Sequence, residues 1–234
     1  MRPRSEEELH AIYDQSYVDQ YDPHAVERIR RMVPFFDLAG DQIVADFGCG
    51  NGVLLELIAS KVRQYVGVDF SEAFVRAAER RRDERGIRNG TFHCADILAF
   101  CTLHPNHFHA AFALDFSEHL YDERFLAIFR AIHAALRPGA VLYLHTPNRE
   151  YFMEYLRAWG VLGQIEGHVA VRDARGLESL LARCGFANVH VRSLPHYLAP
   201  AAALHGLGRL PVLGRYFRAR LLLTCRAART KREG

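Results

Sequence analysis

The chain has 234 residues, a length that suits one α/β domain or a domain with a small cap, and half of its residues are apolar. Its formal net charge of +3 is too small to indicate a nucleic-acid partner, and its five cysteines form no C-x-x-C pair, which is typical of a reducing compartment. With no apolar signal at the N-terminus and no run of roughly 20 apolar residues, we expect a cytoplasmic protein.

The N-terminal residues 1–39 are predicted to form a helical lid, interrupted at Asp22-Pro23. Within it, Tyr13, Tyr17 and Tyr21 recur at a spacing of four, so they share one helical face. Such a stripe can pack into the core or close over a ligand, and the sequence leaves both interpretations open.

A glycine-rich turn follows the first predicted strand, residues 43–47, and precedes a predicted helix at 53–62. Glycine permits a tight turn and lets backbone amides approach a ligand closely. The glycines fall at alternate positions, and they are Gly48, Gly50 and Gly52. The arrangement is typical of the first half of a nucleoside-binding βαβ unit.

The second predicted strand, residues 65–69, ends in Asp69. A carboxylate there can accept hydrogen bonds from two ribose hydroxyls, although capping the next helix is an alternative role. The turn departs from the Gly-x-Gly-x-x-Gly dinucleotide pattern because its third glycine comes one residue early. Asp46, two residues before the first glycine, would repel a pyrophosphate but not an ammonium group. These features favour S-adenosyl-L-methionine, which carries an adenosine, an amine and a sulfonium but no phosphate, over NAD.

Helices and strands continue to alternate along the rest of the chain. This alternation predicts a Rossmann-like, doubly wound, mostly parallel α/β sheet, in which ligands bind beyond the carboxyl ends of the strands. Asp96, Asp115 and His145 lie at such ends and are expected at one rim. The predicted elements are a helix from Ser71 to Gly86, strands at 91–94, 110–114 and 140–145, a helix that begins at Asp122 and ends at Pro138-Gly139, a helix at 174–184, and strands at 188–193 and 221–227.

Two stretches interrupt the alternation, at about 147–172 and 195–218. The second is apolar but broken by prolines and glycines, so it cannot form one regular helix. Its mixture of apolar and basic residues through position 220 has several interpretations: packing on the sheet, a roof over a greasy substrate, a dimer contact, or a peripheral membrane contact. Whether the protein is a monomer or a homodimer stays open.

These motifs together resemble the class I S-adenosylmethionine-dependent methyltransferases over roughly residues 40–227. The resemblance implies a methyltransferase domain at 40–234 and a seven-stranded sheet of order 3-2-1-4-5-7-6 with a reversed last strand. It rests on Asp46-Phe-Gly-Cys-Gly-Asn-Gly52, on the ribose-binding turn Val68-Asp69-Phe70-Ser71, and on Cys94-Ala95-Asp96-Ile97, whose acid faces the adenine amino group in the family. The expected cofactor site comprises Asp46, Gly48, Gly50, Gly52, Asp69, Phe70, Ser71, Ala95, Asp96, Ile97 and Asp115, although Asp96 can also be a turn-forming residue.

A narrower resemblance is to the small-molecule branch that includes the ubiquinone-pathway O-methyltransferases. It rests on Glu118-His119, Leu136-Arg-Pro-Gly139, Thr146-Pro-Asn148, His168 and Gly185-Phe186. The pair Asp115-Phe116 and the insertion at 195–218 depart from that branch and leave the substrate open. The resemblance implies O-methylation of a small, phenolic or lipid-like acceptor.

Methyl transfer to a hydroxyl needs a group that accepts the hydroxyl proton. His119 is the first candidate for this base, because it follows the fourth strand and a histidine can be neutral near pH 7. His168 is the second catalytic candidate, in a segment able to fold over the pocket. A histidine that only orders a loop is the alternative for His119, and Glu118 could orient an imidazole or bind a divalent ion. We expect no required metal.

Several functions compete with O-methylation. The acceptor atom could be nitrogen or carbon, since the fold does not choose it. The protein could also bind S-adenosylmethionine as a non-catalytic regulatory module. A nicotinamide dehydrogenase is opposed by the glycine spacing and Asp46, and a nucleic-acid methyltransferase by the modest charge.

Overall fold

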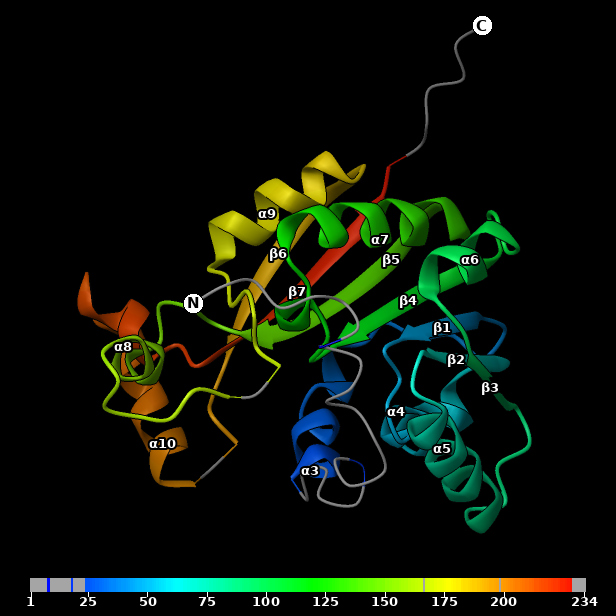
Figure 1. The fold of residues 1–234 in the computed structure, drawn as a ribbon, viewed down its shortest axis with the longest axis horizontal. Helices are drawn as coiled ribbons and strands as arrows, with labels where there is room; N and C mark the ends of the chain where they lie inside the picture. The colour runs from blue at the N-terminus through cyan, green and yellow to red at the C-terminus, as the bar shows by residue number, and fades with distance from the viewer. Residues whose placement is uncertain (1–7, 9–17, 19–23, 166, 198, 229–234) are drawn as a thin grey trace, which may run out of the picture.

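The computed structural model describes residues 24–165, 167–197 and 199–228, together with positions 8 and 18 (Figure 1). The tyrosine stripe of Tyr13, Tyr17 and Tyr21 lies outside the described residues, so its role stays a prediction. In the described part, α3 (Ala25–Arg30) and the 3-10 turn η1 (Val33–Phe35) precede a seven-stranded sheet of order β3-β2-β1-β4-β5-β7-β6. The predicted fold class and strand order are confirmed.

The sheet is parallel except at its last strand, β7, which runs antiparallel to both β5 and β6. β1 lies between β2 and β4 and pairs with both in parallel, so the carboxyl ends of these three strands meet at one edge. The strands are β1 (Ile43–Phe47), β2 (Gln64–Asp69), β3 (Gly90–Cys94), β4 (Phe108–Leu114), β5 (Leu136–Pro147), β6 (Phe186–Leu194) and β7 (Arg220–Ala227).

Helices cover both faces of the sheet, and each face has its own apolar core (Figure 1). On one face, α6 (Ile97–Thr102), α7 (Asp122–Ala135) and α9 (Ala174–Arg183) bury a cluster with Phe47 and Phe129 at its centre. On the other face lie α3, α4 (Val53–Ile58) and α5 (Glu72–Glu84). The two layers hold the sheet edge rigidly while leaving its rim open to ligands.

Three local predictions were wrong. The helix expected to reach Pro138-Gly139 ends at Ala135, and both residues belong to β5, where Gly139 takes a positive φ of 83° near a register shift against β4. Asp122 does not cap that helix, because its carboxylate binds Arg172 instead, at 2.9 and 2.7 Å. The predicted helix 53–62 ends at Ile58 and continues as the 3-10 turn η2 (Ala59–Lys61).

The two interruptions predicted in the alternation fold at the same end of the molecule (Figure 1). The first carries α8 (Phe152–Ala158), and the second carries α10 (Ala199–Ala203), η4 (Leu204–Arg209) and η5 (Leu213–Phe217). Aromatic contacts join them, with ring centroids 5.6 Å apart for Tyr155 and Tyr216. Among the described residues, no helix combines the length and the apolar composition needed to cross a membrane.

Candidate functional site

The glycine turn after β1 is built so that only glycine fits. Gly48, Gly50 and Gly52 all have positive φ, at 73°, 51° and 75°. A Cβ at Gly48 would lie 2.8 Å from the Phe116 ring, and one at Gly52 would lie 3.0 Å from Ala78 Cβ. The turn is therefore held in a conformation and a packing that side chains would disrupt, which keeps its bare backbone at the rim.

Asp69 connects this turn to the end of β2. Its Oδ2 accepts a hydrogen bond from Gly50 N at 3.0 Å, and its Oδ1 accepts one from Ser71 N at 2.9 Å. Ser71 itself caps α5, since its Oγ accepts from Phe74 N at 3.4 Å. Two backbone amides therefore hold the Asp69 carboxylate in a fixed orientation at the end of β2.

A small cavity, open to solvent, lies beside this turn and brings together three of the predicted site residues, Asp46, Gly48 and Asp115. Ala25 and Ile29 of α3 line it as well, so the described part of the N-terminal region covers the first motif. The other lining residues are Cys49, Asn51, Val53, Leu54 and Leu114.

Asp46 is only 3 % exposed, and Tyr65 Oη donates a hydrogen bond to its Oδ2 at 2.5 Å. Burial raises the pKa of Asp46 to about 7, opposed by the Tyr65 hydrogen bond and assisted by the negative charge of Asp69. A cationic group brought to this end of the cavity would favour the ionised form. The sequence analysis missed Tyr65, which gives no signal as a site residue because it is one of a continuous run of buried residues in β2.

The segment predicted to face adenine, residues 94–97, lies beside β2 but does not line this cavity. Ala95 N donates to Asp69 O at 3.0 Å, which holds the segment beside β2. Asp96 caps α6, accepting from Leu98 N at 2.9 Å, and it also binds Arg124 at 2.6 Å. This is the turn-forming role that the sequence left open. Phe70 is 37 % exposed and Ile97 is buried, and the described cavity lining includes neither them nor Asp96.

Both predicted catalytic histidines lie together beyond the end of β4. The rings of His119 and His168 meet edge to face with centroids 5.2 Å apart, and His119 Nδ1 lies 2.9 Å from Gly167 O. Burial lowers the pKa of His168 to about 3, with the charges of His119 and Arg220 acting in the same direction. His168 is therefore a neutral ring near pH 7 and cannot act as a cation.

Glu118 stands beside this pair in the 3-10 turn η3 (Ser117–His119). It is 1 % exposed and accepts a hydrogen bond from Thr146 Oγ1 at 3.0 Å. Three potential metal ligands meet here, because one ligand atom from each of Glu118, His119 and His168 lies within 4.8 Å of the other two. A carboxylate with two imidazoles is a set of donors that suits a divalent cation. The expectation of a metal-independent reaction stays a prediction.

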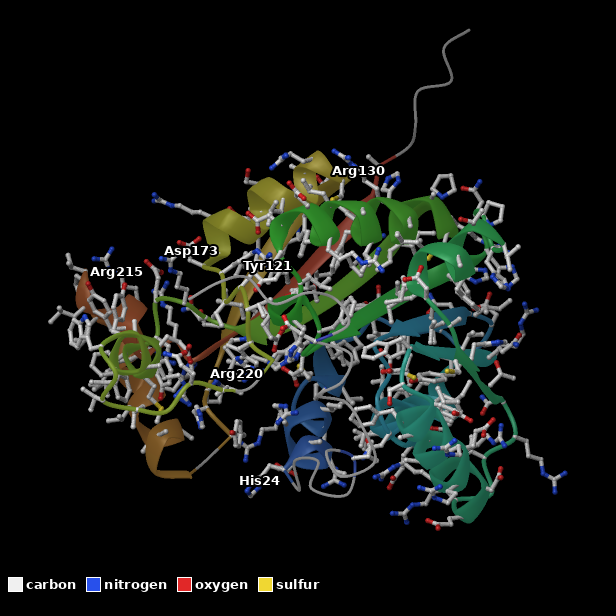
Figure 2. All side chains as sticks on the ribbon, in the orientation of Figure 1. His24, Tyr121, Arg130, Asp173, Arg215 and Arg220 are labelled. Atoms are coloured by element: carbon white, nitrogen blue, oxygen red, sulfur yellow. The ribbon has the colours of Figure 1, made fainter. Side chains whose placement is uncertain are left out.

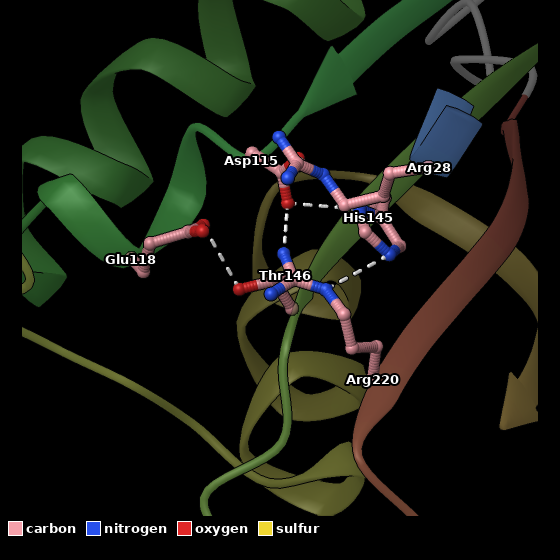
Figure 3. A network of polar contacts seen from close by, with 6 residues as sticks. All are labelled: Arg28, Asp115, Glu118, His145, Thr146 and Arg220. Carbon is pink, nitrogen blue, oxygen red and sulfur yellow. Dashed lines mark hydrogen bonds and ion pairs between the residues drawn. The ribbon is translucent and has the colours of Figure 1, made fainter. Parts of the chain in front are cut away.

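Asp115 is the centre of a buried network that the sequence analysis did not foresee (Figure 3). It has a positive φ of 54°, and its carboxylate pairs with Arg28 Nε at 2.7 Å, with Arg220 Nη2, and with His145 Nδ1 at 2.9 Å. Although burial acts to raise it, the Arg220 and Arg28 guanidiniums hold the pKa of Asp115 well below its usual range. Asp115 lines the cavity as expected, but its carboxylate is committed to these arginines.

The arginines come from α3 and β7, 87 and 105 residues away from Asp115 along the chain. No local spacing links positions so far apart. In the sequence, Arg220 is one basic residue of an arginine-rich C-terminal region and Arg28 one of several in the first helix. Only the folded arrangement distinguishes them.

A family profile described as a methyltransferase domain matches residues 18–191. The chain belongs to the methyltransferase domain family. The resemblance inferred from the motifs is thereby confirmed at the level of the family. Its described fold agrees with that assignment through the strand order and the reversed β7.

Curated relatives of this methyltransferase domain include ubiquinone biosynthesis O-methyltransferases. The protein from Idiomarina loihiensis is 32 % identical over 125 residues, which cover 52 % of this chain and 50 % of the relative. The protein from Albidiferax ferrireducens is 27 % identical over 130 residues, which cover 56 % of this chain and 49 % of the relative. The chain spans about half the length of the curated relatives it matches.

Solved structures extend the likeness of fold to nearly the whole chain. A SAM-dependent methyltransferase from Archaeoglobus fulgidus superposes with a TM-score of 0.64 at 17 % identity, covering 91 % of this chain and 94 % of the other. The phosphoethanolamine N-methyltransferase 2 of Haemonchus contortus, solved with phosphomonomethylethanolamine and S-adenosylhomocysteine, gives 0.66 at 16 % identity and covers 97 % and 60 %. At these identities the likeness establishes the fold.

We predict that Asp46→Asn changes how stability depends on pH. A carboxyl group whose folded pKa is raised from 3.8 to about 7 binds its proton more tightly when folded, so its contribution to stability is present at low pH and lost as pH rises through that window. Relative to wild type, the variant should gain unfolding free energy between about pH 4 and pH 7, by up to about 1.4 kcal/mol per pH unit.

Urea unfolding of the ligand-free protein at several pH values measures this gain. Asp41→Asn, at an exposed aspartate just before β1, is the matched control and should show no such trend. A pH-independent difference between wild type and Asp46→Asn would contradict the assignment of the raised pKa to Asp46.

Proposed function

We propose that the protein transfers a methyl group from S-adenosyl-L-methionine to a hydroxyl group of a small molecule. The observation that carries this proposal is the cavity lined by Asp46, Gly48 and Asp115, next to a backbone-oriented Asp69. The O-methyltransferase names of the curated relatives support oxygen as the acceptor atom.

The residues fit the cofactor at three points. Asp69 would accept the two ribose hydroxyls, the amides of the glycine turn would approach the methionine end, and Asp46 would favour a cationic amine nearby. Packing against Phe116 and Ala78 requires glycine at positions 48 and 52, which keeps the turn free of side chains beside the cavity. When bound, S-adenosylmethionine supplies a methyl group that its sulfonium already activates. The chain therefore mainly has to orient the acceptor, which is worth about 7–11 kcal/mol of barrier in well-aligned reactions.

His119 would accept the proton of the hydroxyl as its oxygen bonds the methyl carbon and the carbon–sulfur bond breaks, leaving S-adenosylhomocysteine. Gly167 O, 2.9 Å from Nδ1, orients the His119 ring. His168, neutral and edge-on to His119, would pack against the acceptor or hydrogen-bond it. A nitrogen or carbon acceptor, and a non-catalytic role in binding S-adenosylmethionine, remain the alternative functions.

We also propose that the end of the molecule formed by both insertions contacts an anionic membrane surface, which would suit a lipid-like acceptor. Trp159, Val161 and Val212 are 74 %, 67 % and 81 % exposed there, and Leu210 and Leu213 accompany them. Figure 2 shows Arg215 at this same end, and Arg209 and Arg218 are exposed too. A surface that combines exposed apolar side chains with arginines suits the interface of an anionic bilayer.

Isothermal titration with S-adenosylhomocysteine tests the cofactor assignment. Wild type should bind, and Asp69→Ala should bind about 100-fold more weakly, because hydrogen bonds to a charged group are worth about 1.5–3 kcal/mol each. The control is Asp83→Ala, which removes an exposed carboxylate of α5 and should leave S-adenosylhomocysteine binding unchanged. Failure of wild type to bind, or equal binding by Asp69→Ala, would refute this cofactor site.

We expect His119→Gln to lower kcat by about 10²–10⁴-fold with the accepted phenol or alcohol, because the base is lost. Its affinity for S-adenosylhomocysteine should stay at the wild-type value. His190→Gln, at an exposed position of β6, is the control and should keep full activity. An unchanged kcat in His119→Gln would show that His119 only orders its loop.

Co-sedimentation with vesicles tests the membrane contact. Wild type should bind vesicles that contain phosphatidylglycerol and not vesicles of pure phosphatidylcholine, and Trp159→Ser combined with Val212→Ser should abolish binding. Leu103→Ser removes a 77 % exposed apolar side chain after α6 and should have no effect. If vesicles do not bind while size-exclusion chromatography shows a dimer that the double variant separates, the surface is a contact between two copies.

A further inference from the structure

Arg220 occupies a central place between the proposed cofactor cavity and the two insertions. It is the first residue of β7, and its side chain is 12 % exposed. Its guanidinium meets Asp115, which lines the cavity, so it lies on the acceptor side of the proposed methyl-transfer site (Figure 3). Whatever binds beyond Asp115 binds next to this charge.

The positive charge of Arg220 is incompletely balanced. Its Nη2 donates to Asp115, and its Nε donates to His145 Nε2 at 3.2 Å, whereas the described residues offer no acceptor to Nη1. Asp115 also pairs with Arg28, so one carboxylate is shared between two guanidiniums. A buried charge held in this way is stabilised by an additional anion.

His145 does not supply that balance. Because its Nε2 accepts from Arg220, the ring proton belongs on Nδ1, which lies 2.9 Å from Asp115 Oδ1. Burial lowers the pKa of His145 to about 4, so the ring is neutral near pH 7. The histidine holds Arg220 in place and contributes no negative charge.

A second buried hydrogen-bond donor, Tyr151, belongs to the segment that backbone hydrogen bonds tie to the start of β7. Tyr151 is 3 % exposed, and its Oη has no hydrogen-bond partner among the described residues. Tyr151 N donates to Asn148 O at 2.9 Å, and Asn148 N donates to Ala219 O at 3.1 Å, which ties Tyr151 to the residue before Arg220. Burial raises the pKa of the Tyr151 phenol, so it stays a donor.

A neutral aromatic wall completes the surroundings. The ring of His196 stacks near Tyr151 with centroids 5.9 Å apart, and against Tyr197 at 4.3 Å. Burial lowers the pKa of His196 to about 4, and the Arg220 charge acts in the same direction. The charge of Arg220 also acts to lower the pKa of Glu118 and of Glu154, so both acids lie within its electrostatic range. Among the described residues, however, Asp115 is the acid that pairs directly with Arg220, and the rest of the wall is aromatic.

We propose that the methyl acceptor carries an anionic group, a carboxylate or a phosphate, and that Arg220 binds it with Tyr151 as a second donor. This inference rests on the proposed methyl transfer and specifies its substrate class. A guanidinium presents a planar pair of donors that matches either anion, and the charge-assisted hydrogen bonds would fix which oxygen of the acceptor faces the methyl group.

Titration of three probes into wild-type protein, with and without saturating S-adenosylhomocysteine, tests the proposal. Phenylacetate represents the carboxylate, phenyl phosphate the phosphate, and phenylacetamide is the neutral counterpart of the first. We expect one or both anions to bind and the amide to bind at least about tenfold more weakly. The stronger of the two anions identifies the acceptor group.

Variants then assign the anion to Arg220. Arg220→Gln should weaken binding of the favoured anion at least about tenfold, Tyr151→Phe should weaken it less, and Arg220→Lys should retain part of it. Arg226→Gln is the matched control, because Arg226 is an exposed residue of the same strand that bonds only Gly139 O, at 3.0 Å. Unchanged binding of S-adenosylhomocysteine shows that each variant is folded.

Equal binding of acid and amide, no binding of either anion at millimolar concentration, or full anion binding by Arg220→Gln would overturn the proposal. If wild type binds no S-adenosylhomocysteine, the proposed methyl transfer fails, and the probes titrated alone still decide whether Arg220 holds an anion.

Discussion

The parallel pairing of β1 with β2 on one side and β4 on the other is the constraint from which the functional rim follows. Because all three strands run the same way, the segments that leave their carboxyl ends emerge at one edge. These segments are the glycine turn, the Asp69 turn and the Asp115 loop. Backbone hydrogen bonds from Gly48 and Cys49 to Val68 O then lock the first two together. The cavity there is lined by three segments that are far apart in sequence, at 25–29, 46–54 and 114–115.

Each carboxylate buried at this rim has a different partner, and the partners divide the rim into two halves. Backbone amides hold Asp69 and a phenol holds Asp46, so the first half keeps negative character that suits a cationic cofactor. Arginines hold Asp115, so the second half is positive. Burying a charge requires such compensation. The choice of partner, more than the carboxylates themselves, sets the charge that each half presents, and our proposals for the cofactor and the acceptor follow from it.

The insertions and the reversed strand β7 lie on the side of the rim where we propose that the acceptor binds. β7 brings Arg220 next to β5, and the contact of Tyr155 with Tyr216 packs the two insertions on each other near that point. Solved structures with the same fold and 16–17 % identity include an N-methyltransferase, so the sheet itself does not select an acceptor.

The sequence by itself determined the family and, through the resemblance to that family, the strand order, and it predicts the position of the cofactor rim. It could do so because glycine spacing, strand-terminal acids and the alternation of apolar segments are local features, and Asp69 with Ser71 or Gly48 with Gly52 lie within a few residues of each other. Local signals also misled, since Pro138-Gly139 lies within a strand that pairs from Leu136 onward. Only the tertiary structure decided the partners of the buried charges, because Arg28, Tyr65 and Arg220 meet their carboxylates across 19 to 105 residues of chain. Contacts at such separations depend on which strands become neighbours, and no periodicity along the sequence encodes them.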